Sequence, residues 1–193
     1  MGQDIGRTRV EDGGSRKRGI EAIRSPLYTP EQRLRRDASK WTLVQGLLAP
    51  LQFLIFLISL GLVLRTLATG EGLAAAHASI VVKTLVLYSI MVTGAIWEKE
   101  VFGKYLFAAP FFWEDVVSMG VIALHTAYLL ALATGWLGSE ALLLLALAAY
   151  LAYVVNAAQF LWKLRMARLD EARATGSGPV PAEAATPAMG AAR

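Results

Sequence analysis

The sequence contains no cysteine among its 193 residues. This absence excludes disulfides, thiolate nucleophiles, iron–sulfur clusters and zinc sites built from thiolates. Metal-binding spacings such as His-Glu-x-x-His are missing as well, and so are glycine-rich nucleotide loops and an arguable Ser–His–Asp set. The sequence therefore signals no cofactor.

Charged residues are scarce over four long stretches of the chain, at about residues 41–64, 76–97, 116–134 and 140–162. The chain is 55% hydrophobic, its mean hydropathy is +0.47, and its charges gather near the two ends and in one central loop. About 20 apolar residues in a helix cross the hydrocarbon core of a bilayer. We therefore predict an all-α membrane protein, a bundle of four transmembrane helices.

The two ends of the chain differ from this membrane domain, which we place at residues 26–169. Residues 1–25 are polar and basic without apolar periodicity, and residues 170–193 are rich in Ala, Gly, Pro and Thr. We expect both tails to be disordered. Thr29 and Gln32 have the spacing of a capping box around Pro30, so a short interfacial helix is predicted to begin there.

The basic residues predict the topology. Of the 19 lysines and arginines, ten precede Trp41, two lie in the central loop and five follow Trp162. Only Arg65 falls at the opposite side, and Lys83 lies within the second span. The positive-inside rule then places both termini and the central loop in the cytoplasm. Basic residues beside the spans are expected to attract anionic lipid rather than nucleic acid.

The central loop, residues 97–115, is the most polar part of the membrane domain. It begins at Trp97-Glu98, closes at Trp113-Glu114, and concentrates carboxylates, lysines and aromatic rings. Counting depth at about 1.5 Å per residue from the cytoplasmic tryptophans places three amides of other spans level with its acids. These amides are Gln45, Asn156 and Gln159. We expect one interfacial site shared by all four helices.

Each of these polar residues also has a structural interpretation. The acids can be solvated charges paired with Lys99 and Lys104, and the amides can join helices by hydrogen bonds. Lys83 and His125 can form a buried structural pair, and interfacial aromatic residues often serve as membrane anchors.

Clustered carboxylates at a membrane interface also have a chemical interpretation. Partial desolvation and mutual repulsion both raise a carboxyl pKa, so one acid can stay protonated beside an ionised one. Such a pair can protonate a substrate and activate water. His125, deeper in the third span, is a candidate ligand for the metal at the centre of a tetrapyrrole. By themselves, the residues indicate an acidic, aromatic interfacial site and specify no reaction.

Seven motifs in this order along the chain resemble the vinyl (bacterio)chlorophyllide hydratases. They are YTPEQR (28–33), WTLVQG (41–46), LAPLQF (48–53), IWEK (96–99), VFGKY (101–105), FFWED (111–115) and YVVNAAQFLWK (153–163). The resemblance covers about residues 27–169 and leaves the tails outside. It implies hydration of the C3 vinyl group of chlorophyllide a, or of a bacteriochlorophyllide relative, to a 1-hydroxyethyl group during bacteriochlorophyll biosynthesis. It implies no cofactor, and the partners it implies are the pigment, water and membrane lipid.

The implied reaction requires a proton on the terminal vinyl carbon, a cation delocalised over the macrocycle, and attack by water. Our hypothesis is that Glu114 or Glu98 donates the proton, and that Asp115 or the remaining glutamate positions the water. The residues expected to bind the pigment are His125 through its magnesium, Lys99 or Lys104 through its propionate, the aromatic rings of Trp97, Trp113, Phe111 and Phe112, and the amides of Gln45, Asn156 and Gln159.

Two other functions remain open at this point. A pigment carrier or photosystem assembly factor would use the same histidine and aromatic rings but would return the pigment unchanged. A small proton-coupled transporter needs a continuous polar path, and the uncharged outer halves of the first and fourth spans argue against one. The sequence also leaves open self-assembly, contact with neighbouring pathway enzymes, and the choice between the inner and the intracytoplasmic membrane.

Overall fold

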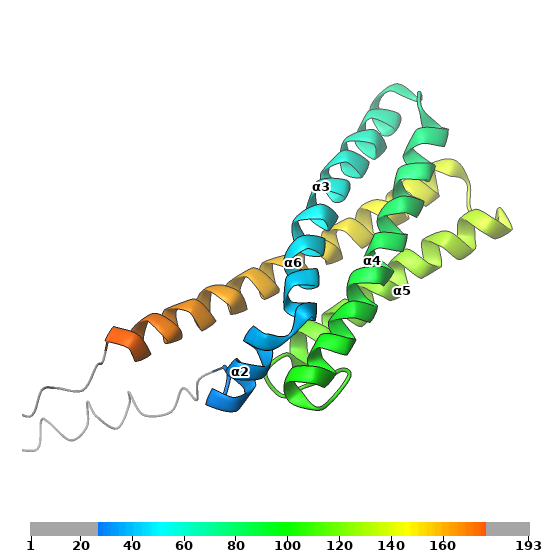
Figure 1. Ribbon diagram of the computed structural model, residues 1–193. Helices are drawn as coiled ribbons and strands as arrows, with labels where there is room; N and C mark the ends of the chain where they lie inside the picture. Colours follow the sequence, from blue (N-terminus) through cyan, green and yellow to red (C-terminus); the bar gives the residue numbers. More distant parts are fainter. Residues whose placement is uncertain (1–26, 177–193) are drawn as a thin grey trace, which may run out of the picture.

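The computed structural model describes residues 27–176, and these residues form helices and no strand. Four of the helices are long and apolar enough to cross a membrane, so the predicted fold class is confirmed (Figure 1). The sequence predicts disorder for residues 1–25 and 170–193. Residues 1–25 and 177–193 lie outside the described residues, whereas residues 170–176 are helical. The helices are α2 (Pro30–Ala38), α3 (Lys40–Thr69), α4 (Leu73–Phe102), α5 (Phe112–Thr134) and α6 (Ser139–Gly176).

The long helices extend beyond the apolar stretches that predicted them. Helix α4 continues to Phe102 and ends where Gly103 adopts a left-handed conformation, with φ of 82°. A left-handed residue after the last turn is a common way to end a helix, and glycine adopts it without steric cost. Glu98 and Lys99 are therefore helical rather than part of the loop. Helix α6 likewise runs past the boundary expected at residue 169.

The predicted capping box is confirmed at the start of α2. The backbone N–H of Gln32 donates to Thr29 Oγ1 at 3.2 Å, and the backbone N–H of Thr29 donates to Gln32 Oε1 at 2.9 Å. Ser39 caps α3 in turn and donates its hydroxyl to Glu100 Oε2 at 2.6 Å. This last bond ties the junction of α2 and α3 to the end of α4.

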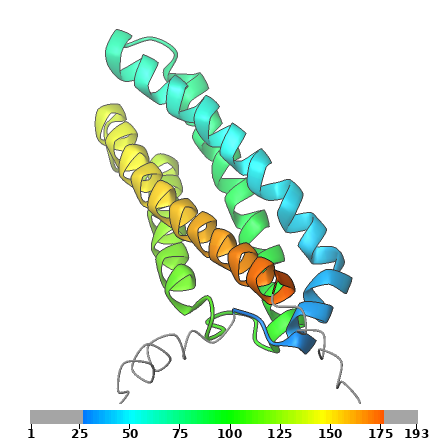
Figure 2. The same ribbon diagram turned by 90° about the vertical axis from the view of Figure 1, so that its left-hand side faces the viewer.

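The four long helices pack as two antiparallel hairpins, α3 with α4 and α5 with α6, which cross each other (Figures 1 and 2). Leucines such as Leu43, Leu54 and Leu151 are exposed, whereas Lys83 and His125 are fully buried. Such a distribution is the reverse of that in a water-soluble bundle and fits helices that face lipid.

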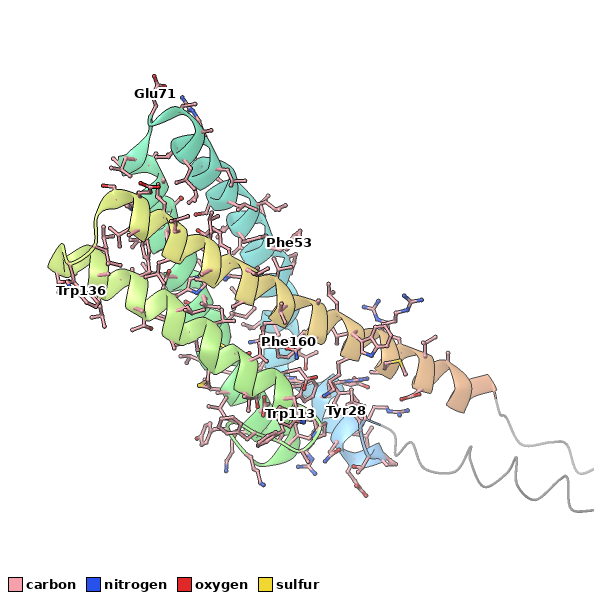
Figure 3. All side chains as sticks on the ribbon, turned by 180° about the vertical axis from the view of Figure 1, so that it is seen from behind. Tyr28, Phe53, Glu71, Trp113, Trp136 and Phe160 are labelled. Atoms are coloured by element: carbon pink, nitrogen blue, oxygen red, sulfur yellow. The ribbon has the colours of Figure 1, made fainter. Side chains whose placement is uncertain are left out.

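The two ends of the bundle are distinct. One end carries α2 and the loop between α4 and α5, and we call it the loop end; the other carries the turns at Gly70–Gly72 and Gly135–Gly138, and we call it the turn end. Figure 3 shows Tyr28, Trp113 and Phe160 toward the loop end and Glu71 and Trp136 at the turn end. The main apolar core lies between the middle and the turn end, and a smaller cluster of Tyr28, Val101, Phe111 and Ala167 closes the loop end.

Candidate functional site

Three of the four acids in the 97–115 stretch converge at the loop end. Glu98 comes from the last turns of α4, whereas Glu114 and Asp115 come from the first turn of α5. Their exposed fractions are only 5%, 7% and 3%. Carboxyl groups are rarely buried without partners, so each of the three must have an interaction that compensates for its burial. Glu100, the fourth acid, is exposed and accepts the hydroxyl of Ser39.

Glu98 and Asp115 form a carboxyl pair. Their side chains are within hydrogen-bonding contact of each other. Two carboxyl groups can share a hydrogen bond only if one of them holds a proton, since an ionised carboxylate is an acceptor alone. The geometry therefore brings together two carboxyl groups that can act as a carboxylic acid beside a carboxylate.

The loop backbone binds both members of this pair. The N–H of Phe107 donates to Asp115 Oδ2 at 2.6 Å, and the N–H of the next residue, Ala108, donates to Glu98 Oε2 at 3.3 Å. The shorter bond favours the negative charge on Asp115, because a hydrogen bond from a backbone N–H stabilises the ionised form. Glu98, with the longer bond, is then the member that carries the proton.

Phe107 has a strained backbone. Its φ is +59°, and it is the one residue other than glycine with positive φ in the described part of the chain. A bulky residue in this conformation is uncommon and persists only where its surroundings hold it. Here the conformation presents two successive N–H groups to the acid pair. No pattern in the sequence pointed to it.

Glu114 has a different partner from the other two acids. Lys163 of α6 forms an ion pair with Glu114 Oε2 at 2.7 Å and also donates to the carbonyl of Pro110. Asn156 donates to the backbone carbonyl of Glu114 at 3.1 Å and to Ser118 Oγ at 2.8 Å. Helix α6 thus fixes the first turn of α5 and supplies Glu114 with a positive counter-charge.

The sequence aligns Lys163 with Asn156 and Gln159 on one helix face but assigns it no role at the acids. It predicts Lys99 and Lys104 as their partners. Instead, Lys99 donates to the carbonyl of Gly103 at 3.1 Å and lies 5.3 Å from the Tyr105 ring, and Lys104 is exposed. Lys163 lies four residues after Gln159 and seven after Asn156, a helical spacing that places all three on one face of α6 and could have identified it.

The expected aromatic residues divide into two groups. Phe111 is buried and packs edge-on against Trp97, with centroids 5.7 Å apart, and face-to-face against Phe160 at 6.1 Å. Trp97 also donates its indole N–H to Thr42 Oγ1 at 2.9 Å. By contrast, Phe112 and Trp113 are exposed. The first group supports the loop end from inside, and only the second presents open ring surface.

The amides of Gln45 and Gln159 lie in different settings. Gln45 joins α3 to α4 by donating to Thr93 Oγ1 at 2.7 Å and to the carbonyl of Ile90 at 3.3 Å. Gln159 is partly buried, and its Oε1 has no hydrogen-bond partner among the described residues. Gln45 is therefore engaged in holding a hairpin together, whereas Gln159 keeps an acceptor available.

His125 lies deeper in the bundle and does not reach the acids. Its Nδ1 bonds to the carbonyl of Val121 at 2.8 Å and its Nε2 to Lys83 Nζ at 2.8 Å. With both ring nitrogens engaged, neither is open to a metal ion in this arrangement. The described residues also contain no group of three or more His, Asp and Glu side chains placed to hold a metal.

Comparison with known proteins identifies similar chains. Residues 28–166 match the family model described as 2-vinyl bacteriochlorophyllide hydratase. The chain is 74% identical over 145 residues to a protein of Cereibacter sphaeroides with that name, covering 75% of this chain and 89% of the relative. It is 67% identical over 149 residues to a protein of Rhodobacter capsulatus with the same name, covering 77% of this chain and 86% of the relative. No solved structure matches.

Proposed function

Since this chain belongs to the 2-vinyl bacteriochlorophyllide hydratase family, we propose that it adds water to the vinyl group of a bacteriochlorophyllide-type pigment at the Glu98–Asp115 pair. The chain is a multi-pass membrane enzyme of the hydro-lyase class, acting in bacteriochlorophyll biosynthesis. The observation that carries the catalytic assignment is the burial of Glu98 and Asp115 side by side, each bound by one of two successive loop N–H groups.

Glu98 is the proton donor in this mechanism. Its O–H bond breaks as the π electrons of the vinyl group form a C–H bond at the terminal carbon. The resulting cation, on the carbon attached to the ring, is delocalised over the macrocycle. Glu114 is less suited to this step than Glu98, because its carboxylate is already engaged in an ion pair with Lys163 at 2.7 Å.

Asp115 is the base that activates water. A water oxygen bonds to the cationic carbon and releases a proton to Asp115, which completes the 1-hydroxyethyl group. The proton then returns to Glu98 across the hydrogen bond between the two carboxyl groups, so the pair ends in its starting state. Two adjacent carboxyl groups suit this reaction, since the proton and the hydroxyl are added to adjacent carbons.

The pigment reaches this pair from the membrane at the loop end. Exposed Phe112 and Trp113 offer ring surface to the macrocycle. Gln159, one turn before Lys163 on α6, offers an acceptor with no partner among the described residues. His125 does not act as a magnesium ligand in this mechanism, because both of its ring nitrogens are engaged.

The orientation and exact substrate also belong to the proposal. The distribution of basic residues supports cytoplasmic termini and a cytoplasmic loop end, in the inner or intracytoplasmic membrane. Chlorophyllide a and its bacteriochlorophyllide relatives both carry the vinyl group at C3, and we assign the reaction to that position.

A spectral assay tests the proposed function. Membranes that contain the protein are incubated with the vinyl pigment and no nucleotide or reductant. Hydration removes the vinyl group from conjugation, so the absorption band moves to shorter wavelength. Pigment that is bound by folded protein but keeps its spectrum would instead favour a non-enzymatic carrier.

A further inference from the structure

Gln52 is an unexplained polar group in the middle of the membrane domain. Its exposed fraction is 1%, and neither its Oε1 nor its Nε2 has a hydrogen-bond partner among the described residues. A buried amide without partners destabilises a fold, and native structures rarely keep one unless a water or a ligand completes its bonds. The reaction at the loop end makes no use of it.

A second donor lies about one helical turn away. Hydrogen bonds from Gln45 to Thr93 and between Ser59 and Ser79 set the register of α3 against α4. This register places Lys83 opposite the turn that follows Gln52. Lys83 is fully buried and lies 4.3 Å from the ring centroid of Tyr153.

Lys83 has hydrogen-bonding capacity beyond its bond to His125. The carbonyl of Val121 can only accept, so His125 donates from Nδ1, and its Nε2 is an acceptor in the neutral ring. Lys83 therefore donates to Nε2 and keeps at least one further N–H, whether it is an ammonium or an amine. Gln52 and Lys83 together offer donors to an acceptor such as a carbonyl oxygen.

The depth of Gln52 matches the size of the pigment. Trp97 bonds to Thr42, so Thr42 marks the level of the acids on α3. Gln52 follows ten residues later, about 15 Å deeper at the helical rise. That depth is about half of the hydrocarbon core, roughly the width of a tetrapyrrole macrocycle. In a bacteriochlorophyllide the ketone of the fifth ring lies at the opposite edge from the vinyl-bearing ring.

Several side chains in the half of the bundle where the macrocycle would lie keep some exposed surface. Val63 and Ile80, toward the turn end, have no exposed surface. In contrast, Met91, Asn156 and Gln159, which lie between Gln52 and the loop end, are partly exposed. The two hairpins share fewer contacts with each other than the helices share within each hairpin, so a planar ring between them would displace less packing.

We propose that Gln52, with Lys83 beside it, binds the ketone oxygen of the pigment and so positions its vinyl edge at the Glu98–Asp115 pair. The inference rests on the proposed function, because that function identifies the ligand. Gln52 and Lys83 are positioning residues here and do not contact the reacting carbons.

Vibrational spectroscopy of a bound pigment tests this proposal without any turnover. The probe is a pigment whose vinyl group has been reduced to an ethyl group, which cannot be hydrated, bound to purified protein in detergent. We expect the ketone C=O stretch to fall below its value in a non-hydrogen-bonding solvent. In Gln52→Leu the frequency should return toward that value, and Kd should rise about three- to tenfold.

Ser59→Ala is the matched control. Ser59 is also a fully buried polar residue of α3, and it bonds to Tyr150 at 2.5 Å rather than to the proposed ligand. Ser59→Ala should leave the ketone C=O frequency and the Kd for the pigment unchanged. A wild-type frequency equal to that of a free ketone, or no change in Gln52→Leu, would overturn the inference alone and would leave a buried water as the partner of Gln52. If the wild-type protein binds no pigment, both the inference and the proposed function are overturned.

Discussion

Asp115 and Glu98 differ in how strongly the loop backbone binds them, and this difference divides the chemistry between them. Asp115 accepts the shorter bond, at 2.6 Å, and is suited to remain the carboxylate. Glu98 accepts a longer one at 3.3 Å and is suited to hold the proton. The nearby Glu114 is paired with Lys163 and is excluded from that exchange. Three acids of similar type therefore lie in three different settings, and the proposed mechanism gives each a role that follows from its partners.

Replacing Asp115 tests the assignment of the base. Asp115→Asn keeps the size of the side chain but cannot accept a proton from water, so we expect kcat to fall about a hundredfold or more. Glu100→Gln serves as the control, because Glu100 is exposed and belongs to the same stretch. Rates are measured from the blue shift of the pigment. Equal loss in both variants would contradict the assignment.

The ion pair between Glu114 and Lys163 makes a separate prediction about stability. Lys163→Met leaves a buried carboxylate without its counter-charge, so it should lower the free energy of unfolding by about 3 kcal/mol. The double variant Glu114→Gln with Lys163→Met should recover most of this loss, because neither charge remains. Equilibrium unfolding in mixed detergent micelles measures both. A double variant less stable than the single variant would contradict this role of the ion pair.

Among the elements, the loop from Gly103 to Phe111 matters most, because it links the two hairpins and binds the acid pair through its backbone. Its geometry depends on Phe107 in a left-handed conformation. The aromatic cluster of Trp97, Phe102 and Phe111 fixes its two ends. The loop thus holds the acids in contact while the substrate is absent.

Substitutions of Phe107 test the loop. Phe107→Gly favours the left-handed backbone and should keep at least a third of the wild-type rate. In Phe107→Val the branched side chain disfavours that conformation by about 1–2 kcal/mol, so the two N–H groups should leave the acids and kcat should fall about tenfold. Circular dichroism checks that both variants stay helical. A higher kcat for Phe107→Val than for Phe107→Gly would contradict this role of the backbone.

The sequence predicts the elements well and the site only in part. Apolar length predicted α3 to α6, and the Thr29–Gln32 spacing predicted the cap of α2, because both signals are local. Counting depth along the predicted helices also placed Glu98, Glu114 and Asp115 at one level of the membrane. Which acid pairs with which partner depends on how α6 rotates against α5, and the conformation of Phe107 depends on tertiary contacts. Neither can be read from local patterns.

At the scale of the whole molecule, two hairpins meet through a small number of polar contacts at different depths. The acid pair joins α4 to α5 near the loop end, and Lys83 joins the same helices through His125 farther in. Polar contacts between helices in a membrane hold the pairing without a large apolar interface. This arrangement leaves the hairpins able to separate locally for a flat ligand.

The absence of cysteine makes the topology directly testable. Single cysteines are introduced at Lys104 in the loop and at Glu71 in the turn between α3 and α4, both exposed. A thiol reagent that cannot cross the membrane should label the Lys104→Cys protein in inside-out vesicles and the Glu71→Cys protein in spheroplasts. The opposite pattern would invert the topology and place the acid pair outside the cytoplasm.

The central claim is that the chain adds water to the vinyl group through Glu98. Mass spectrometry of the pigment after incubation in ¹⁸O-labelled water measures this most directly, with wild-type protein and Glu98→Gln compared at equal pigment occupancy. The wild-type product should gain one water carrying the label, and Glu98→Gln should return the bound pigment unchanged over the same time. Labelled product formed by Glu98→Gln at the wild-type rate would contradict the account.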